Sequence, residues 1–252
     1  MVHALLAVAA FTVVPADSCG PGALLPAYSH NDYNNGRPFH DAVAAGMRGV
    51  EADLFLEGEH LLVGHSRGKL SSEGTLERLY LAPLRDRWQR CGQLLPDGQA
   101  FLLNLELKEK DPFAFGLLVR QLTAYQDVME GGPVRVVMVG WWPPQSSEWP
   151  AFLGVQLPLE DDPLSGIATA GPPVGLVSVD YSRSLKWNGR GTPSRSALAA
   201  LARARAAATA LAVPLRVHQV PPNSAVQRWL LRDGVDLIGL KSLGEAALLP
   251  RP

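Results

Sequence analysis

The sequence predicts a single (β/α)8 barrel, the TIM-barrel fold, and three observations support this prediction. The chain has 252 residues, a common size for one such barrel. Eight short apolar runs alternate with segments of helical periodicity, as expected for repeated strand–helix–strand units. No repeat, charge block or long linker divides the chain. An open doubly wound sheet is the alternative, and the lack of a glycine-rich phosphate loop after the first strand disfavours it.

The expected strands are short apolar runs bounded by turn residues. They cover residues 24–29, 49–56, 100–108, 134–140, 154–157, 175–180, 215–220 and 235–240. A further short strand is expected over residues 60–64, directly after the second of these.

The apolar spacing between the strands predicts helices. They cover residues 38–45, 75–84, 112–125, 194–211 and 224–232. Pro38 suits a first helical turn, and Ser194 and Ser224 are suitable N-caps. Residues 141–173 are rich in proline and poorly periodic, so the second half of the barrel is expected to be irregular.

The N-terminus has the features of a signal peptide. Residues 2–14 are almost continuously apolar but too short to span a bilayer comfortably. Val14-Pro15-Ala16 fits the small-residue rule for cleavage before Asp17. We therefore expect a signal peptide over 1–16, one domain over 17–252, no stable membrane span, and a secreted or periplasmic location. The alternatives are a buried N-terminal strand and a trimmed gene start.

The composition excludes several classes of protein. Hydrophobic residues make up 47% of the chain, enough for a large core, so disorder and coiled coil are poor interpretations. The net charge of -1 argues against nucleic acid as a partner, because binding a phosphate backbone usually needs a basic excess. Two cysteines, Cys19 and Cys91, are too few for a disulfide-dense scaffold. They could pair in an exported chain, and their separation in the sequence does not settle this.

Charged residues in the expected strands are informative because only 19% of the chain is charged. The strand over 49–56 carries Glu51 and Asp53 on one face, since residues i and i+2 point the same way. Two neighbouring carboxylates are costly to bury, and a bound cation would stabilise both. An exposed edge strand is the alternative.

Other strand ends carry polar groups as well. His30 follows the first strand, His65 ends the short one, and Asn104, Glu106 and Lys108 share a face of the next. Catalytic groups of such barrels lie at the carboxyl ends of the strands, so these residues are expected to lie together. Two histidines, three carboxylates and a lysine suit metal-assisted chemistry with two proton-transfer groups. Oxygen ligands suit Ca²⁺ or Mg²⁺ better than Zn²⁺.

In the order His-Asn, Glu-x-Asp, Gly-His and Glu-x-Lys, these residues resemble the phospholipase C-like phosphodiesterase superfamily. It includes glycerophosphodiester phosphodiesterases and the barrel of phosphoinositide phospholipase C. Within it, the chain looks most like the family of altered inheritance of mitochondria protein 6. That likeness covers most of residues 24–243 and rests on these motifs: His30-Asn31-Asp32-Tyr33, Glu51-Ala52-Asp53, Leu62-Val63-Gly64-His65, and the segments over 79–84, 185–189 and 234–238.

The resemblance implies a barrel of the phospholipase C-like phosphodiesterase type and a role for each matching residue. The residues that look like ligands of one divalent cation, Ca²⁺ or Mg²⁺, are Asn31, Glu51, Asp53 and Glu106. His30 is expected to act as the base and His65 as the acid. The residues expected to contact substrate are Lys108, Asp180 and Trp187. Two positions depart from relatives: Asn31 stands where glycerophosphodiesterases usually have Arg, and the last strand ends near Lys241 where the family usually has Asp.

The expected function is metal-dependent hydrolysis of a glycerophosphodiester or a phospholipid head group by a monomer. Membrane contact is expected to be transient at most. Two alternatives stay open: transfer to an internal hydroxyl that gives a cyclic phosphate, and a non-catalytic barrel that binds a phosphodiester or phospholipid. A sugar-processing barrel is disfavoured, because Glu51 and Asp53 lie too close on one strand to flank a glycosidic bond.

Overall fold

The structure is a computed structural model that describes Cys19 and residues 23–143, 149–158 and 172–249. The signal peptide predicted over 1–16 lies outside the described residues. Much of the segment predicted to be irregular also lies outside them. In the part that is described, the pairing of the fifth and sixth barrel strands shifts register between Val155 and Gln156.

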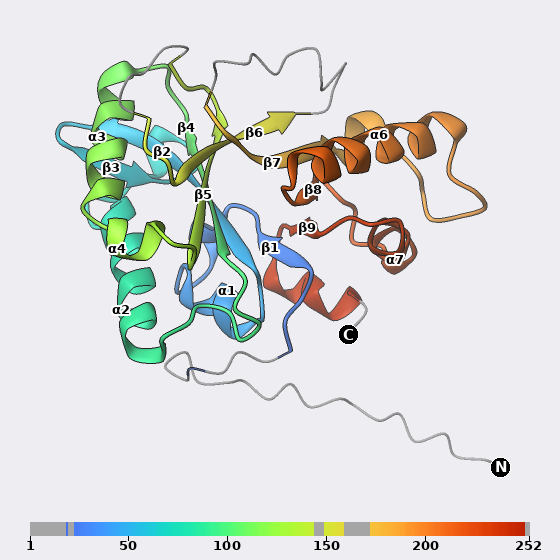
Figure 1. Ribbon diagram of the computed structural model, residues 1–252, viewed down its shortest axis with the longest axis horizontal. Coiled ribbons are helices and arrows are strands. Elements are labelled where there is room, and N and C mark those ends of the chain that lie inside the picture. Colours follow the sequence, from blue (N-terminus) through green and yellow to red (C-terminus); the bar gives the residue numbers. More distant parts are fainter. Residues whose placement is uncertain (1–18, 20–22, 144–148, 159–171, 250–252) are drawn as a thin grey trace.

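Eight parallel strands close into a barrel, which confirms the predicted fold (Figure 1). They are β1 (Ala27–Ser29), β2 (Gly49–Glu57), β4 (Phe101–Leu107), β5 (Val134–Gly140), β6 (Leu153–Pro158), β7 (Val174–Asp180), β8 (Leu215–His218) and β9 (Leu237–Leu240). The barrel closes because β1 pairs with both β9 and β2. The short β3 (His60–Val63) runs antiparallel to β2 as the second arm of a hairpin.

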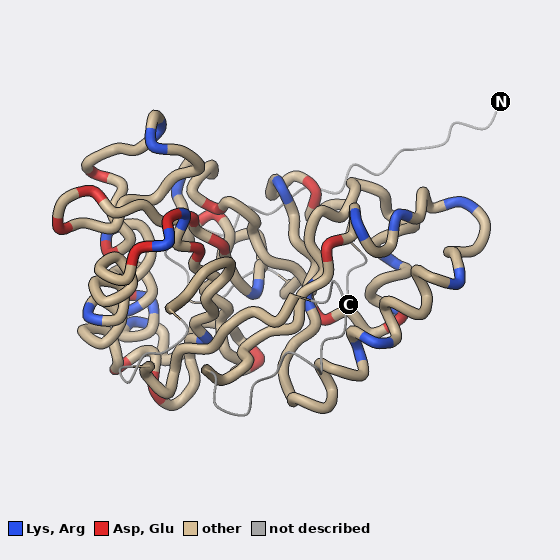
Figure 2. Tube along the Cα trace, turned by 90° about the horizontal axis from the view of Figure 1, so that it is seen from above, with Lys and Arg blue, Asp and Glu red and all other residues tan. Residues whose placement is uncertain are grey.

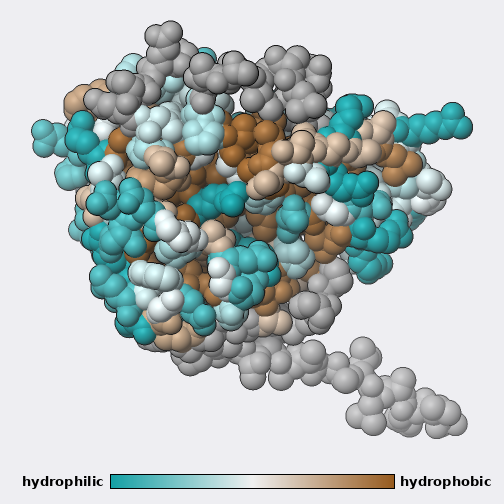
Figure 3. All heavy atoms as spheres, in the orientation of Figure 1, coloured by the Kyte–Doolittle hydropathy of each residue, from teal (hydrophilic) through white to brown (hydrophobic). Residues whose placement is uncertain are grey.

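Helices cover the barrel on two sides. Among the described residues the α-helices are α1 (His40–Ala44), α2 (Ala82–Cys91), α3 (Pro112–Thr123), α4 (Gln126–Met129), α5 (Tyr181–Ser184), α6 (Arg195–Leu211) and α7 (Ser224–Arg232). Figure 1 shows α2, α3 and α4 along one side of the molecule and α6 and α7 along the other. In the same view, Figure 3 shows hydrophobic residues mainly across the middle and hydrophilic residues over the two flanks.

Of the two predicted serine N-caps, one is confirmed and the other is replaced by its neighbour. Ser194 caps α6 as predicted, because its side chain accepts a hydrogen bond from the Ala197 amide. The prediction that Ser224 caps α7 is wrong. Asn223 is the cap, and its side chain accepts from the amides of Ala225 and Val226. Asn and Ser are equally favourable N-cap residues, so the backbone geometry decides which side chain accepts from the free amides.

Two other predicted helices differ in their bounds. The first begins at His40 rather than Pro38, because Phe39 adopts a positive φ of 63° that no helix tolerates. The helix expected over 75–84 starts as a π-helical turn at Glu77–Leu81 and continues as α2 to Cys91. It ends there because Gly92 turns to the left-handed conformation.

The barrel interior holds a second apolar cluster, separate from the main core and built from five strands. Its members are Tyr28, Leu102, Val137, Leu176 and Leu237. Tyr28 lies opposite Gly239 in the β1–β9 register and is fully buried. A Cβ atom at position 239 would lie 2.5 Å from the Tyr28 hydroxyl, so the glycine makes room for the tyrosine.

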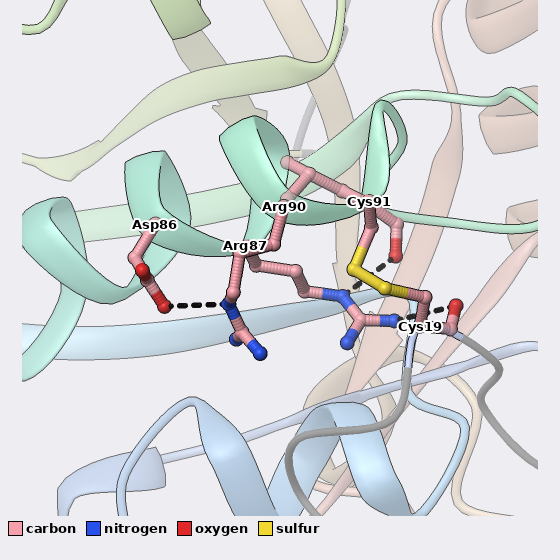
Figure 4. Close-up of a disulfide and its surroundings, with 6 residues drawn as sticks. Cys19, Asp86, Arg87, Arg90 and Cys91 are labelled. Carbon is pink, nitrogen blue, oxygen red and sulfur yellow. Dashed lines mark hydrogen bonds and ion pairs between the residues drawn. A yellow bond between two sulfur atoms is a disulfide. The ribbon is translucent and has the colours of Figure 1, made fainter.

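A disulfide joins Cys19, ahead of β1, to Cys91 at the end of α2 (Figure 4). Their Cα atoms are 5.3 Å apart. The buried Arg87 lies beside the disulfide and donates to the carbonyl of Cys19 at 3.3 Å and to that of Leu94 at 3.4 Å. The disulfide and Arg87 together fasten the start of the domain to α2.

Candidate active site

The residues predicted for the active site lie at the carboxyl ends of β1, β2, β3 and β4. Parallel pairing places Glu51 opposite Asn104 and Asp53 opposite Glu106. Because alternate residues of a strand share a face, the carboxylates of β2 and β4 point to the same side. His30 follows β1 directly, and His65 lies two residues after β3. The sequence therefore brings these groups to one end of the barrel, where such folds carry their catalytic residues.

Glu51 is buried, with 4% of its surface exposed, and is paired with two bases. Its Oε2 lies 2.5 Å from Nδ1 of His30 and 3.7 Å from Nη1 of Arg216. Burial alone would raise the pKa of Glu51. The positive charge of Arg216 and the hydrogen bond from His30 outweigh it and lower the pKa to about 2. Glu51 is therefore an ionised carboxylate that orients His30.

Asp53 lies two residues after Glu51 on β2, closer to the barrel mouth, and is paired in a similar way. Its Oδ2 accepts a hydrogen bond from the Tyr33 hydroxyl at 2.7 Å and lies 3.3 Å from Nδ1 of His65. Nζ of Lys108 is 3.7 Å from the same oxygen. Burial and the hydrogen bond to Asp53 raise the pKa of Tyr33, so this tyrosine stays a proton donor. The side chain of His65 is 63% exposed, whereas that of His30 is 22% exposed.

Glu106 and Lys108 complete the cluster. Nζ of Lys108 donates to Oε1 of Glu106 at 3.1 Å. Burial raises the pKa of Glu106, and the charges of Asp53 and Glu51 add to that effect against the attraction of Lys108. Burial opposes the charge on Lys108, but the hydrogen bond to Glu106 and the nearby carboxylates raise its pKa overall. One ammonium group is thus held by carboxylates from two strands.

The chemistry of these donors fits a hard divalent cation. Asp53 and Glu106 both approach a single cationic atom, Nζ of Lys108, and the Glu51 charge acts on it as well. Carboxylate oxygens from adjacent strands are the ligands that Ca²⁺ and Mg²⁺ prefer. The side chains do not form a ready-made cage: no group of three or more His, Cys, Asp or Glu among the described residues is arranged to hold a metal ion.

The loop after β1 is shaped by two residues of the His-Asn-Asp-Tyr motif. Asn31 adopts the left-handed conformation, with φ 52°, and turns the chain directly after His30. Asp32 is fully buried, and its Oδ2 accepts from the Phe39 amide at 2.6 Å while its Oδ1 accepts from the Asn35 side chain at 2.8 Å. Asp32 therefore holds the loop that presents His30 and Tyr33.

Arg216 on β8 is the most important residue near the site that the sequence-based prediction missed. It is 2% exposed, and its Nε donates to the Ser178 hydroxyl at 3.1 Å and its Nη2 to Gln156 Oε1 at 2.5 Å. Its guanidinium lies 4.9 Å from the centre of the Tyr28 ring. An arginine within the apolar run Leu215-Arg216-Val217 is the signal that could have found it.

The predicted substrate contacts of the second half, Asp180 and Trp187, lie at the end of β7 and in the segment that follows it. Asp180 ends β7, and its Oδ1 accepts from the amide and hydroxyl of Ser182, so it caps α5. Nε2 of His218 is 3.8 Å from Asp180, and burial together with Arg216 lowers the pKa of His218 to about 4. Trp187 packs edge-on against Trp229, with ring centres 5.4 Å apart. The substrate roles of Asp180 and Trp187 stay predictions.

Residues 23–94 match the family model described as the AIM6-like phosphodiesterase domain. The chain is 29% identical over 150 residues to an altered inheritance of mitochondria protein 6 homolog from Arthroderma benhamiae, covering 47% of this chain and 48% of that protein. It is 39% identical over 83 residues to altered inheritance of mitochondria protein 6 from Eremothecium gossypii, covering 27% and 21%. The matches thus span at most about half the length of these curated relatives.

Two solved structures of glycerophosphodiester phosphodiesterases share the fold. The enzyme from Agrobacterium tumefaciens superposes with a TM-score of 0.52 at 17% identity, covering 89% of this chain and 100% of that one. The enzyme from Parabacteroides distasonis gives 0.54 at 14% identity, covering 90% and 97%. At these identities the likeness establishes the fold. With the family match, it confirms the resemblance predicted from the sequence: the chain is similar to AIM6-like phosphodiesterases and shares its fold with glycerophosphodiester phosphodiesterases.

Proposed function

We propose that the protein is a metal-dependent phosphoric diester hydrolase acting on a glycerophosphodiester or a phospholipid head group. One observation carries this proposal. Two histidines at one end of the barrel each hold Nδ1 against a carboxylate, His30 on Glu51 and His65 on Asp53. Cleaving a phosphodiester needs one group to remove a proton and another to donate one, and two oriented histidines supply both.

His30 acts as the base. Its Nδ1 is bound to Glu51 at 2.5 Å, so Nε2 is the nitrogen free to take a proton from the attacking water. The ionised Glu51 fixes the ring orientation and stabilises the imidazolium that forms. The same arrangement serves an internal hydroxyl as nucleophile, which would give a cyclic phosphate instead.

His65 acts as the acid and protonates the leaving oxygen. Its greater exposure at the barrel mouth suits a group that must meet the departing part of the substrate. Lys108, whose Nζ lies 3.7 Å from Asp53 and 3.1 Å from Glu106, contacts the phosphoryl oxygens, where a positive charge stabilises the transition state most.

A divalent cation would be held by Asp53, Glu106 and Glu51, with Asn31 as a further oxygen donor. When bound, it would neutralise negative charge on the phosphoryl oxygens. The supporting observation is that Asp53 and Glu106 both lie within 3.7 Å of one cationic atom, Nζ of Lys108, and that the charge of Glu51 acts on it as well.

A panel of phosphodiesters assayed with Ca²⁺, with Mg²⁺ and with chelator tests the function. We expect hydrolysis of at least one glycerophosphodiester that chelator abolishes and one of the two ions restores. Phosphorus NMR of the products separates an open from a cyclic phosphate. Activity that survives chelation overturns the metal requirement. A folded protein that binds these diesters but cleaves none of them overturns the enzymatic proposal in favour of a binding barrel.

We also propose that the protein is exported, with residues 1–16 removed. The Cys19–Cys91 disulfide supports this, because disulfides persist in oxidising compartments. N-terminal mass spectrometry of the protein recovered from its native host is expected to begin at Asp17. A mature chain that still starts at residue 1 with both thiols free would contradict export.

A further inference from the structure

A basic hollow lies on the segment that follows β7. Its volume is about 600 Å³, within the range of small-molecule sites. The lining residues that carry the argument are Arg183, Lys186, Trp187, Arg190, Ser194 and Ser196. None of the described residues that line it is acidic. We call this feature the basic hollow.

The basic hollow belongs to a segment with a marked charge asymmetry. Residues 181–232 contain nine Lys or Arg and no Asp or Glu, whereas the other 200 residues contain 14 and 24. Figure 2 shows Lys and Arg spread over the half of the molecule that holds α6 and α7. The net charge of -1 conceals this positive region. An anion is attracted to this half of the molecule, at long range as well as in contact.

The backbone around the basic hollow is fixed by its own hydrogen bonds. Nε1 of Trp187 donates to the Arg190 carbonyl at 2.8 Å, and the Asn188 side chain accepts from the Arg190 amide at 3.0 Å. Gly189 between them has φ 85°, and a Cβ atom there would lie 2.7 Å from Nδ2 of Asn223. The cationic side chains therefore project from a loop that is already shaped, which reduces the entropy lost on binding.

The start of α6 also favours an anion at this place. Ser194 and Ser196 stand at the start of the 17-residue α6, whose first amides and dipole attract negative charge. Nε of Arg183 is 3.6 Å from Asp180, which in turn lies 3.8 Å from His218 at the barrel mouth. Arg183, one of the lining residues, is thus paired with the last residue of β7.

We propose that the basic hollow binds a phosphate-type anion distinct from the phosphodiester that is cleaved. That anion is either a second phosphate of a soluble substrate or the head group of an anionic lipid, and both present the same chemistry to Lys186 and Arg190. Its use in substrate selection rests on the proposed function, whereas anion binding itself does not.

Calorimetric titration with inorganic phosphate at low ionic strength tests the binding. We expect the Lys186→Gln/Arg190→Gln double variant to bind about tenfold more weakly than the parent chain, because two charge-assisted contacts are lost. The matched control is Arg203→Gln/Arg228→Gln, which removes two exposed charges of the same segment outside the basic hollow and is expected to bind as the parent does. Equal weakening in both double variants, or in neither, overturns the proposal.

Two further arms identify the source of the anion. Co-sedimentation compares vesicles of phosphatidylcholine with vesicles that also contain phosphatidylserine. Kinetics compares two glycerophosphodiesters that differ by one monoester phosphate on the head group. If the parent chain prefers vesicles with phosphatidylserine and Lys186→Gln/Arg190→Gln does not, the anion is a lipid head group. If the parent chain has a lower KM for the diester with the extra phosphate and the double variant does not, the anion belongs to a soluble substrate. No preference in either arm overturns a role in substrate selection. A His30→Ala chain that is inactive but still binds phosphate separates this site from the proposed catalysis.

Discussion

The two halves of the barrel differ in the charged side chains that their strand ends carry. From β1 to β4 the strand ends present carboxylates, each paired with a histidine or a lysine. In the second half, β8 presents two bases, His218 and the buried Arg216, while β7 ends on Asp180 and the basic hollow follows it. Arg216 reaches from β8 to Glu51 on β2 and links the halves. The candidate reacting groups therefore come from the first half, whereas the positive charge that helps to keep Glu51 ionised comes from Arg216 in the second half.

Removing a histidine from the first half should have the largest effect. His30→Ala is expected to lower kcat by about 10²- to 10⁴-fold, because the base that accepts the proton is lost. His65→Ala should lower kcat comparably for substrates with a poor leaving group and much less for a substrate with a good one. His60→Ala, on the exposed start of β3, is the matched control and should keep full activity. Full activity of His65→Ala on a poor leaving group would remove His65 as the acid.

The link between the halves can be broken at Arg216. Arg216→Met is expected to destabilise the fold by about 3–5 kcal/mol, because it leaves the buried Glu51 carboxylate without its cation. Urea denaturation measures this. The double variant Glu51→Leu/Arg216→Met removes both charges and should recover much of the lost stability. A single variant as stable as the parent would show that Glu51 does not depend on the second half.

Removing the disulfide tests whether the first half depends on the covalent link between Cys19, ahead of β1, and Cys91 on α2. Cys19→Ser/Cys91→Ser is expected to lower the free energy of unfolding by about 2–4 kcal/mol, since it releases a long loop in the unfolded chain. The reductant dithiothreitol should weaken the parent chain by the same amount and leave the double variant unchanged. Thermal denaturation with and without the reductant gives both values.

The smallest expected effect is a pH dependence from the second half. The folded-state pKa of His218 is lowered from 6.5 to about 4, so the unfolded chain binds the proton first as pH falls. Stability is therefore expected to decrease below pH 6.5, with no further loss from this group below pH 4. Between pH 7 and pH 5 the loss is about 2 kcal/mol. His218→Gln should flatten this slope, and His60→Gln should not. An unchanged slope in His218→Gln would assign the acid sensitivity to other groups.

The sequence predicts the barrel well because each strand is a short apolar run buried on both faces. All eight expected strands are present, with bounds that differ by at most three residues. The histidines, carboxylates and lysine of the first half are found by the same pattern, since a charge in such a run interrupts it. The carboxylates converge because β2 and β4 pair in parallel, and the antiparallel β2–β3 hairpin returns His65 to Asp53.

The rest of the site depends on contacts between distant residues, which local patterns do not contain. The pairing of Arg216 with Glu51 joins positions 165 residues apart in the sequence. The competition between Asn223 and Ser224 for one cap is decided by backbone geometry. The loop that forms the basic hollow packs Gly189 against the Asn223 side chain, which lies 34 residues further along the chain.

The close fit of Tyr28 and Gly239 has a consequence for comparing related sequences. Any side chain at position 239 would occupy the space of the Tyr28 hydroxyl, so the two positions cannot vary independently. Relatives that keep the tyrosine should keep the glycine, and relatives with a larger residue on the last strand should carry a smaller one on the first. This pair provides a marker of co-variation at the seam where the barrel closes.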